Sequence, residues 1–140
     1  MNLTTLRRLA FVLCLAGSQA FAQGYPDENP SQPYAKQDDG KFLRKHGVNL
    51  ARAKSGPIGL LFIGDSITDN WRKAPHIWDA YYAKYQAANF GIGGDRTQHV
   101  IWRIEHGELE GIAPKVTVLM LGTNNSLHNS AAEIAAANRK

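Results

Sequence analysis

Three short polar stretches hold the residues of this sequence that could do hydrolytic chemistry: Gly64-Asp65-Ser66, Gly93-Gly94-Asp95 and Gly122-Thr123-Asn124-Asn125. A serine hydroxyl becomes an effective nucleophile when a base takes its proton, and the oxyanion formed by its attack on a carbonyl needs fixed hydrogen-bond donors. Ser66 is the candidate nucleophile. The candidate donors of an oxyanion hole are the N–H groups of Ser66 and Gly94 and the side-chain amide of Asn124, because glycine lets the backbone come close to a ligand and asparagine carries amide hydrogens.

Each of these stretches also has a purely structural explanation. Asp65 or Ser66 could cap a following helix, residues 91–94 could form a tight turn between a strand and a helix, and Asn124-Asn125 could form a turn. Asp65 is accordingly given no catalytic role. Taken one at a time these explanations stay open, and only the combination of the three stretches favours chemistry.

Two better-known motifs are incomplete in this sequence. The Gly91-x-Gly93 pair matches part of the dinucleotide-binding fingerprint, but Arg96 stands where the third glycine is expected. The Gly-x-Ser-x-Gly nucleophile elbow of α/β-hydrolases needs a glycine where Thr68 stands. The sequence therefore argues against a dinucleotide cofactor and against the α/β-hydrolase elbow.

Each polar stretch follows a short apolar run that is typical of a buried strand. The runs are residues 58–63, 87–90 and 116–121, with helical patterns at about 77–85 and from 97 to about 108 between them. Strand, helix, strand, helix, strand at this spacing predicts right-handed βαβ units and a parallel sheet covered by helices, which is an α/β fold. Ligands bind beyond the carboxyl ends of such strands, so we expect the three stretches to line one crevice.

The N-terminal residues predict export. Arg7 and Arg8 precede an apolar run at residues 9–16, and Ala20-Phe21-Ala22 has the small-x-small pattern of a cleavage site. We expect a signal peptide over residues 1–22, cleavage near Ala22 and a periplasmic or secreted protein. The apolar run is far shorter than the roughly 20 residues of a membrane-spanning helix, so no stable membrane anchor is expected.

The rest of the chain divides into two parts. Residues 23–56 comprise an N-terminal extension and a helix. The extension is rich in polar residues and proline, and the helix covers about 39–54 and ends at Gly56-Pro57. Residues 57–140 form the α/β domain that carries the polar stretches. Its last expected element is an alanine-rich helix at about 131–138.

Composition excludes several classes of function. The 140 residues, 44% hydrophobic and 20% charged, are typical of one globular domain. The only cysteine, Cys14, lies in the predicted signal peptide, which excludes disulfides, thiol catalysis and cysteine metal sites from the mature chain. Without Arg7 and Arg8 the 16 basic residues become 14, against 12 acidic ones, which gives no support for nucleic-acid binding.

The sequence around the three polar stretches resembles the first three blocks of the GDSL or SGNH hydrolase family, in the same order and at similar spacing. The matching segments are Leu61-Phe62-Ile63-Gly64-Asp65-Ser66-Ile67-Thr68, Asn89-Phe90-Gly91-Ile92-Gly93-Gly94-Asp95-Arg96-Thr97 and Gly122-Thr123-Asn124-Asn125. Two further segments, His99-Val100-Ile101-Trp102-Arg103 and Gly107-Glu108-Leu109-Glu110, are similar to the subgroup of platelet-activating-factor acetylhydrolase catalytic subunits and their bacterial homologues. The resemblance runs from about Leu60 to Ser126.

The resemblance implies a flavodoxin-like three-layer αβα sandwich and hydrolysis of carboxylic esters without a metal or a cofactor. It implies that Ser66 is the nucleophile, that Ser66, Gly94 and Asn124 form the oxyanion hole, and that Asp65 supports the turn. The resemblance supplies the reaction and not the substrate; our leading hypothesis is that the complete protein removes a short acyl group such as acetyl from a carbohydrate, a lipid or a small ester. Acyl-chain length, the alcohol half and the oligomeric state are left open.

The family takes its base from an Asp-x-x-His box near the C-terminus, which this sequence lacks. None of the histidines at positions 46, 76, 99, 106 and 128 has an aspartate three residues before it, and the spacing from Asp95 to His99 is one residue too long. His128, which follows Asn124 closely, is the nearest substitute. We therefore expect the N-terminal part of a sandwich that is incomplete at the C-terminus, with little activity alone and with an exposed apolar sheet edge.

Two other functions stay open. An exported protein that keeps the crevice but has lost the base would bind carbohydrates or esters without hydrolysing them. An exported interaction scaffold would present Trp71, Trp78 and Trp102 at its surface. Apolar neighbours such as Ile77 and Ile101 favour packing of these rings in the core instead.

Overall fold

The computed structural model describes residues 28–140 and contains a parallel sheet of three strands. The strands are β1 (Leu60–Gly64), β2 (Ala87–Gly91) and β3 (Val116–Met120). Their order is β2-β1-β3, so β1 lies in the centre and both neighbours run parallel to it. The predicted signal peptide and its cleavage site near Ala22 lie outside the described residues.

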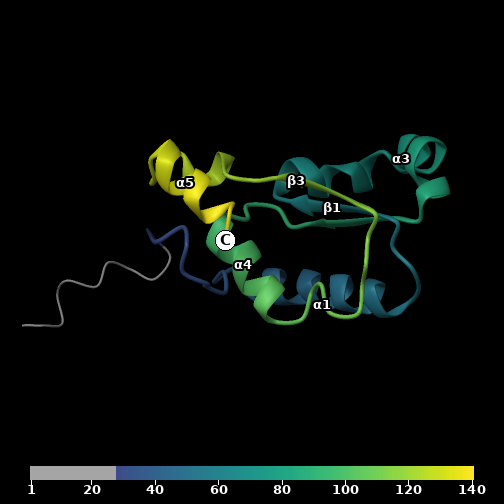
Figure 1. The fold of residues 1–140 in the computed structure, drawn as a ribbon, viewed down its shortest axis with the longest axis horizontal. Coiled ribbons are helices and arrows are strands. Elements are labelled where there is room, and N and C mark those ends of the chain that lie inside the picture. Colours follow the sequence, from purple (N-terminus) through teal and green to yellow (C-terminus); the bar gives the residue numbers. More distant parts are fainter. Residues whose placement is uncertain (1–27) are drawn as a thin grey trace, which may run out of the picture.

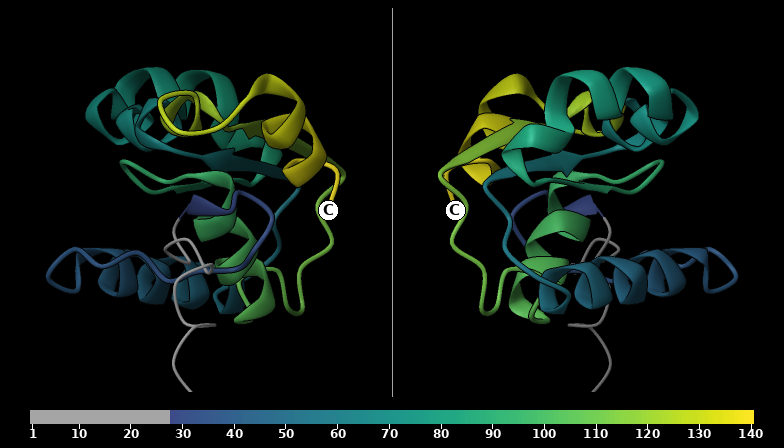
Figure 2. Two further views of the ribbon diagram at one scale, coloured as in Figure 1. Left: turned by 90° about the vertical axis from the view of Figure 1, so that its left-hand side faces the viewer. Right: turned by 90° about the vertical axis from the view of Figure 1, so that its right-hand side faces the viewer.

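Helices cover both faces of the sheet. Figure 1 shows α3 and α5 on one side of the strands and α1 and α4 on the other, and the turned views of Figure 2 show the same three layers. The α-helices are α1 (Lys41–Lys54), α2 (Ser66–Asp69), α3 (Pro75–Tyr82), α4 (Thr97–Glu105) and α5 (Ala131–Ala137), and the 3₁₀ turns are η2 (Asn70–Lys73), η3 (Ala83–Tyr85) and η4 (Thr123–Asn125). The predicted α/β fold, with a parallel sheet between two helical layers, is confirmed.

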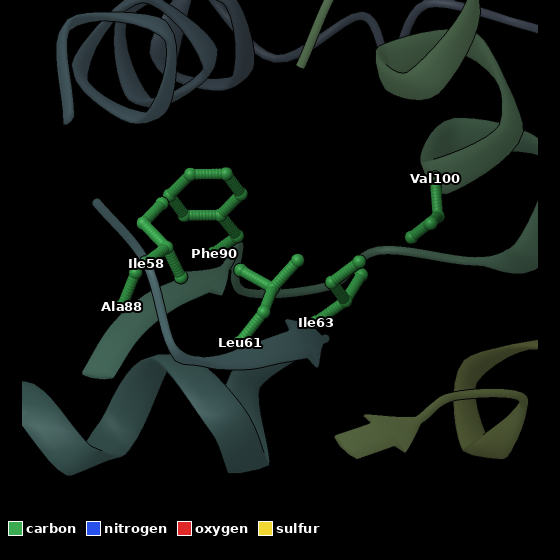
Figure 3. Packing of buried hydrophobic residues seen from close by; sticks show 6 residues of the cluster. All are labelled: Ile58, Leu61, Ile63, Ala88, Phe90 and Val100. Carbon is green, nitrogen blue, oxygen red and sulfur yellow. The ribbon is translucent and has the colours of Figure 1, made fainter. Parts of the chain in front are cut away.

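The apolar runs form a core between the sheet and α4. One cluster of buried side chains joins the first two strands to this helix, and its members are Ile58, Leu61, Ile63, Ala88, Phe90 and Val100 (Figure 3). Successive side chains of a strand point to opposite faces, which is why Leu61 and Ile63 share this core and Phe62 does not. Burial of a large apolar side chain contributes about 1.5–3 kcal/mol, so the runs themselves decide which segments become strands.

The other face of β1 carries a cluster of aromatic rings. The Phe62 ring lies 5.2 Å from the Trp78 ring and 5.1 Å from the Tyr82 ring, and Trp71 contacts both of these partners. On the opposite side of the sheet, Trp102 of α4 packs against rings of α1. All three tryptophans pack against other rings but are only half-buried, so they lie neither in the buried core nor fully at the surface.

Several element boundaries differ from those expected from the sequence. β1 begins two residues after the start of its apolar run, and α3 begins earlier than expected, at Pro75, whose missing N–H suits the first turn of a helix. α4 ends at Glu105 rather than near Glu108. Gly107 turns the chain there with φ +87°, and the Glu108 N–H donates back to the Arg103 carbonyl at 3.1 Å.

The outer edge of β3 is apolar and uncovered. The side chains of Val116, Val118, Leu119 and Met120 are between 38% and 55% exposed, and among residues 28–140 no strand pairs with β3 on this side. The apolar sheet edge expected from the sequence is therefore present. Over the same stretch of chain, no helix is long and apolar enough to cross a membrane.

A buried ionic cluster joins α4 to β2 and to α1. Arg103, Glu108 and Asp95 have no exposed surface. Arg103 Nη1 donates to the Phe90 carbonyl at 2.9 Å and to Glu108 Oε2 at 2.6 Å, and its Nε lies 3.0 Å from an Asp95 oxygen. Asn49 of α1 donates to Glu108 Oε1 at 2.7 Å. Because an unpaired buried charge costs several kcal/mol, these partners decide where α4 packs.

Gly91, the last residue of β2, allows the strand to approach α2 closely. A Cβ built on Gly91 would lie 2.7 Å from the carbonyl carbon of Thr68 and 2.8 Å from the Cα of Asp69. These are backbone atoms, so no side-chain rotation can relieve the clash. A residue with a side chain at position 91 therefore requires the strand and the helix to move apart.

Replacement Gly91→Ala should destabilise the fold by about 1–3 kcal/mol, the usual range for overpacking. The matched control is Gly47→Ala in the exposed middle of α1, where a Cβ would meet no atom within 4 Å. Alanine should stabilise that position by up to about 1 kcal/mol, because it is a better helix former than glycine. Urea unfolding followed by circular dichroism measures both changes, and a Gly91→Ala variant as stable as the wild type would contradict the steric argument.

Candidate active site

Ser66 is the first residue of α2, at the turn that follows β1. Asp65 caps this helix, since its Oδ1 accepts a hydrogen bond from the Ile67 N–H at 2.9 Å. The structural role predicted for Asp65 is thus confirmed. Ser66 itself is exposed, and the N–H groups of a first helical turn have no partner within the helix. The hydroxyl and the N–H of Ser66 are therefore both presented at the end of β1.

The loop after β2 turns directly beside Ser66. Gly94 has φ +76°, in the left-handed region that glycine adopts without strain. The Ile92 N–H donates to the Gly64 carbonyl at 3.1 Å, which ties this loop to the end of β1. A Cβ built on Gly93 would lie 3.9 Å from the Ser66 Cβ, so the two loops are in contact.

Asn124 lies in η4, after β3, and its side chain links the three loops. Its Nδ2 donates to the Asp95 carbonyl at 2.8 Å and lies 3.4 Å from Asp65 Oδ2. The longer contact is near the upper limit for a hydrogen bond, so one amide hydrogen is well engaged and the other is weakly held. Asp95 follows Gly94 and Asp65 precedes Ser66. The structure therefore brings Ser66, Gly94 and Asn124 together at one end of the sheet.

The neighbouring Asn125 is buried and structural. Its Oδ1 accepts a hydrogen bond from the Thr97 N–H at 2.9 Å, and its Nδ2 donates to Gln98 Oε1 at 2.9 Å and to Asn129 Oδ1 at 3.1 Å. These bonds join the loop after β3 to the first turn of α4. The surroundings of the two adjacent amides differ: Asn124 is half-exposed and Asn125 is buried.

Asp95 connects the Gly94 loop to the charges around it. Its Oδ2 lies 3.0 Å from Arg103 Nε, and its Oδ1 lies 3.0 Å from Lys36 Nζ. Burial raises the pKa of Asp95 to about 6, while the charges of Arg103 and Lys36 act in the opposite direction. The two cations therefore favour the ionised form of this buried carboxylate.

Asp69, three residues after Ser66, is also paired with cations. Its carboxylate accepts hydrogen bonds from Lys45 and from Arg72. Burial alone would raise the pKa of Asp69, but Lys45 and Arg72 hold it below its usual value. Arg72 also donates to the Gly91 carbonyl at 2.9 Å, so this group of charges holds η2 on β2.

No hydrogen bond joins a histidine to Ser66 within residues 28–140. His99 is buried, and its Nδ1 accepts the Arg96 N–H at 3.0 Å. His46 is buried beside Glu108, and the histidines at positions 76, 106 and 128 are exposed. None of the hydrogen bonds found within residues 28–140 involves the Ser66 hydroxyl. In this part of the chain the candidate nucleophile therefore has no base hydrogen-bonded to it.

Lys36 is a residue of this site that the sequence analysis missed. It lies in the extension before α1, yet its Nζ donates to the Gly93 carbonyl at 2.7 Å, next to the candidate donor Gly94. Thr97 holds the same extension, because its hydroxyl donates to the Pro30 carbonyl at 2.7 Å. A single lysine in a polar segment has no periodicity and no motif spacing, so only the tertiary contact identifies it.

The arrangement can stabilise a negatively charged oxygen next to a serine hydroxyl. Two backbone N–H groups and one side-chain amide lie on adjacent loops around Ser66, which is the donor set that a tetrahedral intermediate of acyl transfer requires. Residues 28–140 contain no group of three or more histidine, cysteine, aspartate or glutamate side chains that could hold a metal ion.

Comparison with known proteins finds relatives that are named as acetylhydrolase subunits. The chain is 44% identical over 108 residues to "Platelet-activating factor acetylhydrolase IB subunit alpha1" of Bos taurus and of Homo sapiens, a match that covers 74% of this chain and 46% of each relative. It is 41% identical over 113 residues to the alpha2 subunit of Rattus norvegicus, covering 78% of this chain and 48% of the relative. The chain thus spans about half the length of the curated relatives it matches.

A model of a whole protein family also matches this chain. Residues 62–139 match the GDSL-like Lipase/Acylhydrolase family, and this range includes Ser66, Gly94 and Asn124 with the loops that carry them. It covers more than half of the chain, from within β1 to beyond α5. The sequence blocks, the parallel sheet covered by helices and this family match agree. The chain therefore belongs to the GDSL-like lipase/acylhydrolase family.

Proposed function

We propose that this chain provides the nucleophile and the oxyanion hole of a serine ester hydrolase, with Ser66 as the nucleophile. The oxyanion hole consists of the N–H groups of Ser66 and Gly94 and the side-chain amide of Asn124. The observation that carries the proposal is the position of this amide, which donates to the Asp95 carbonyl and contacts Asp65. One side chain thereby joins the residue before the nucleophile to the residue after the glycine donor.

In the first chemical step, Ser66 Oγ forms a bond to the acyl carbon of the ester, and the carbonyl electron pair moves onto its oxygen. The three donors hold this oxyanion. When it collapses, the bond to the alcohol oxygen breaks, the alcohol leaves with the proton that the serine gave up, and the acyl group stays on Oγ. Water then releases the acid by the same route. The proton passes through a base, which the family resemblance assigns to an Asp-x-x-His box that none of the five histidines here forms.

For the substrate, we propose a short acyl group such as acetyl, carried by a carbohydrate, a lipid or a small ester. The names of the relatives support the acyl half, since they are acetylhydrolases of platelet-activating factor. An open, half-exposed site of the kind formed around Ser66 and Asn124 suits a group at the end of a larger alcohol.

A second candidate function is that of an exported protein that binds carbohydrates or esters without hydrolysing them. A hollow of about 290 Å³ favours it, because its lining combines aromatic rings with polar groups, as small-molecule sites do. The hollow lies along β2, and its lining includes Trp71, Trp78, Arg72, Asn49 and Asn89 but not Ser66. Binding there would persist when the serine is removed.

We also propose that the protein is exported, on the strength of the basic start, the apolar run and the Ala20-Phe21-Ala22 pattern. The protein recovered from the periplasm or the medium of an expressing bacterial cell should begin at Gln23, as N-terminal sequencing would show. Recovery of the unprocessed chain from the cytosol alone would contradict export.

Hydrolysis of p-nitrophenyl acetate tests the nucleophile. This chain and a form extended through the downstream coding sequence should be compared, each with a Ser66→Ala variant and with Ser55→Ala as the control at an exposed serine. The extended form should turn over, and Ser66→Ala should lower its kcat by a factor of about a thousand or more, because only binding and the oxyanion hole then remain.

Ser55→Ala should keep the activity. An extended form that is inert but still binds the ester would favour the binding protein, and full activity of Ser66→Ala would show that another group is the nucleophile.

The two adjacent asparagines should separate catalysis from stability. Asn124→Ala removes the amide donor and should lower kcat about 100- to 1000-fold with a modest change in unfolding free energy. Asn125→Ala removes two buried hydrogen bonds and one part-buried one and should destabilise the fold by about 1–3 kcal/mol instead. Ester hydrolysis and urea unfolding of both variants measure this contrast, and equal effects on kcat would argue against an oxyanion role for Asn124.

A further inference from the structure

Lys36 makes a contact with the site that its place in the sequence does not suggest. Its Nζ donates to the Gly93 carbonyl at 2.7 Å across 57 residues of chain, and it pairs with Asp95 Oδ1 at 3.0 Å. The side chain is only 16% exposed, and it lies over the turn that contains Gly94: a Cβ built on Gly94 would be 3.7 Å from the same Nζ. A surface lysine with a loose ion pair would show neither this burial nor a bond to a backbone carbonyl.

The carbonyl that Lys36 holds belongs to the peptide group that supplies the glycine donor. The C=O of Gly93 and the N–H of Gly94 are parts of one planar unit, and in a trans peptide they point in opposite directions. An ammonium group that fixes the direction of this carbonyl therefore also fixes the direction of the Gly94 N–H.

This peptide needs such a restraint more than others do. It lies between two glycines, which have no side chains to hold it and which adopt positive and negative φ about equally well. Rotation of this peptide would change the direction of the Gly94 N–H while leaving the rest of the loop in place. Preorganised donors stabilise an oxyanion because they need no reorientation during the reaction, and a freely rotating peptide would lose that advantage.

A second contact restrains the other side of Gly94. The Asn124 amide donates to the Asp95 carbonyl at 2.8 Å, so Lys36 and Asn124 hold the carbonyls of the residues before and after the glycine. The positive charge of the Lys36 ammonium beside the Gly93 oxygen also polarises the peptide, which strengthens its N–H as a donor. Lys36 thus acts on the orientation and on the strength of this donor without touching the oxyanion.

We propose that Lys36 is a positioning residue of the oxyanion hole: it orients the Gly93–Gly94 peptide so that the Gly94 N–H points at the developing negative charge. The assignment rests on the proposed function, since it presupposes that Gly94 is an oxyanion donor. It also extends the site to the segment before α1, which no feature of the hydrolase sequence blocks includes.

The kinetic test compares Lys36→Met, Lys36→Arg and the control Lys41→Met, an exposed lysine of α1, in the form of the protein that hydrolyses p-nitrophenyl acetate. Lys36→Met should lower kcat about 10- to 100-fold and change KM less than twofold, because a misdirected donor costs less than a removed one. Lys36→Arg should keep kcat within about fivefold, since it retains the charge and the donor. A Lys36→Met variant with unchanged kcat would overturn the proposal.

A spectroscopic test separates this proposal from the proposed function. In protein labelled with ¹⁵N-glycine, Lys36→Met should shift and broaden the Gly94 amide signal, whereas Lys41→Met should leave it unchanged. The other glycine signals report whether the Lys36→Met variant is folded. If those signals lose their dispersion, Lys36→Gln, which fills similar space without the charge, is measured in place of Lys36→Met.

An unchanged Gly94 signal in a folded variant would overturn the positioning role whatever the activity. If Ser66→Ala shows that the protein is no serine hydrolase, the proposed function fails, and the Gly94 signal alone then decides whether Lys36 orients this peptide.

Discussion

The structure depends most on the buried guanidinium of Arg103. This group has no exposed surface, and an unpaired charge in such a place would cost several kcal/mol. Its partners are the carbonyl at the end of β2, the Glu108 carboxylate and Asp95, and they come from a strand, a turn and a loop. Pairing one cation with all of them leaves α4 a single position against the sheet.

The candidate site is built outward from this cluster. Asp95 faces Arg103 with one carboxylate oxygen and Lys36 with the other, while its backbone carbonyl accepts the Asn124 amide. One residue therefore couples the charge balance of the core to the geometry of the Gly94 loop. Two cations and two carboxylates meet here, so the cluster as a whole buries little net charge.

The strands add the second constraint. Parallel strands bring their carboxyl ends to one edge of the sheet, so loops that are 28 or more residues apart along the chain become neighbours there. At Gly91, β2 lies so close to α2 that no side chain fits between them, which brings the loop after β2 close to Ser66 at the start of α2. The contacts that hold Ser66, Gly94 and Asn124 all come from within residues 28–140, in contrast to β3, whose apolar outer edge has no cover there.

The sequence by itself determined the elements, the fold class and the candidate site residues. Apolar runs followed by glycine predict buried parallel strands, and the three polar stretches with the order of the family blocks single out Ser66, Gly94 and Asn124. These features are local, because periodicity, turn residues and motif spacing act over a few residues. Helix ends were less predictable: α4 stops at Glu105 because Gly107 and the return of Glu108 to Arg103 override an otherwise helical pattern.

Only the tertiary structure decided which polar residues serve the core and which serve the site. Asn124 and Asn125 are chemically identical neighbours, and one faces the loops of Ser66 and Gly94 while the other is buried against α4. The role proposed for Lys36 also depends on a tertiary contact, its hydrogen bond to the Gly93 carbonyl 57 residues away in sequence. The physical reason is that a hydrogen bond or an ion pair takes its strength from burial and from the direction of its partners, and both exist only once distant segments have packed together.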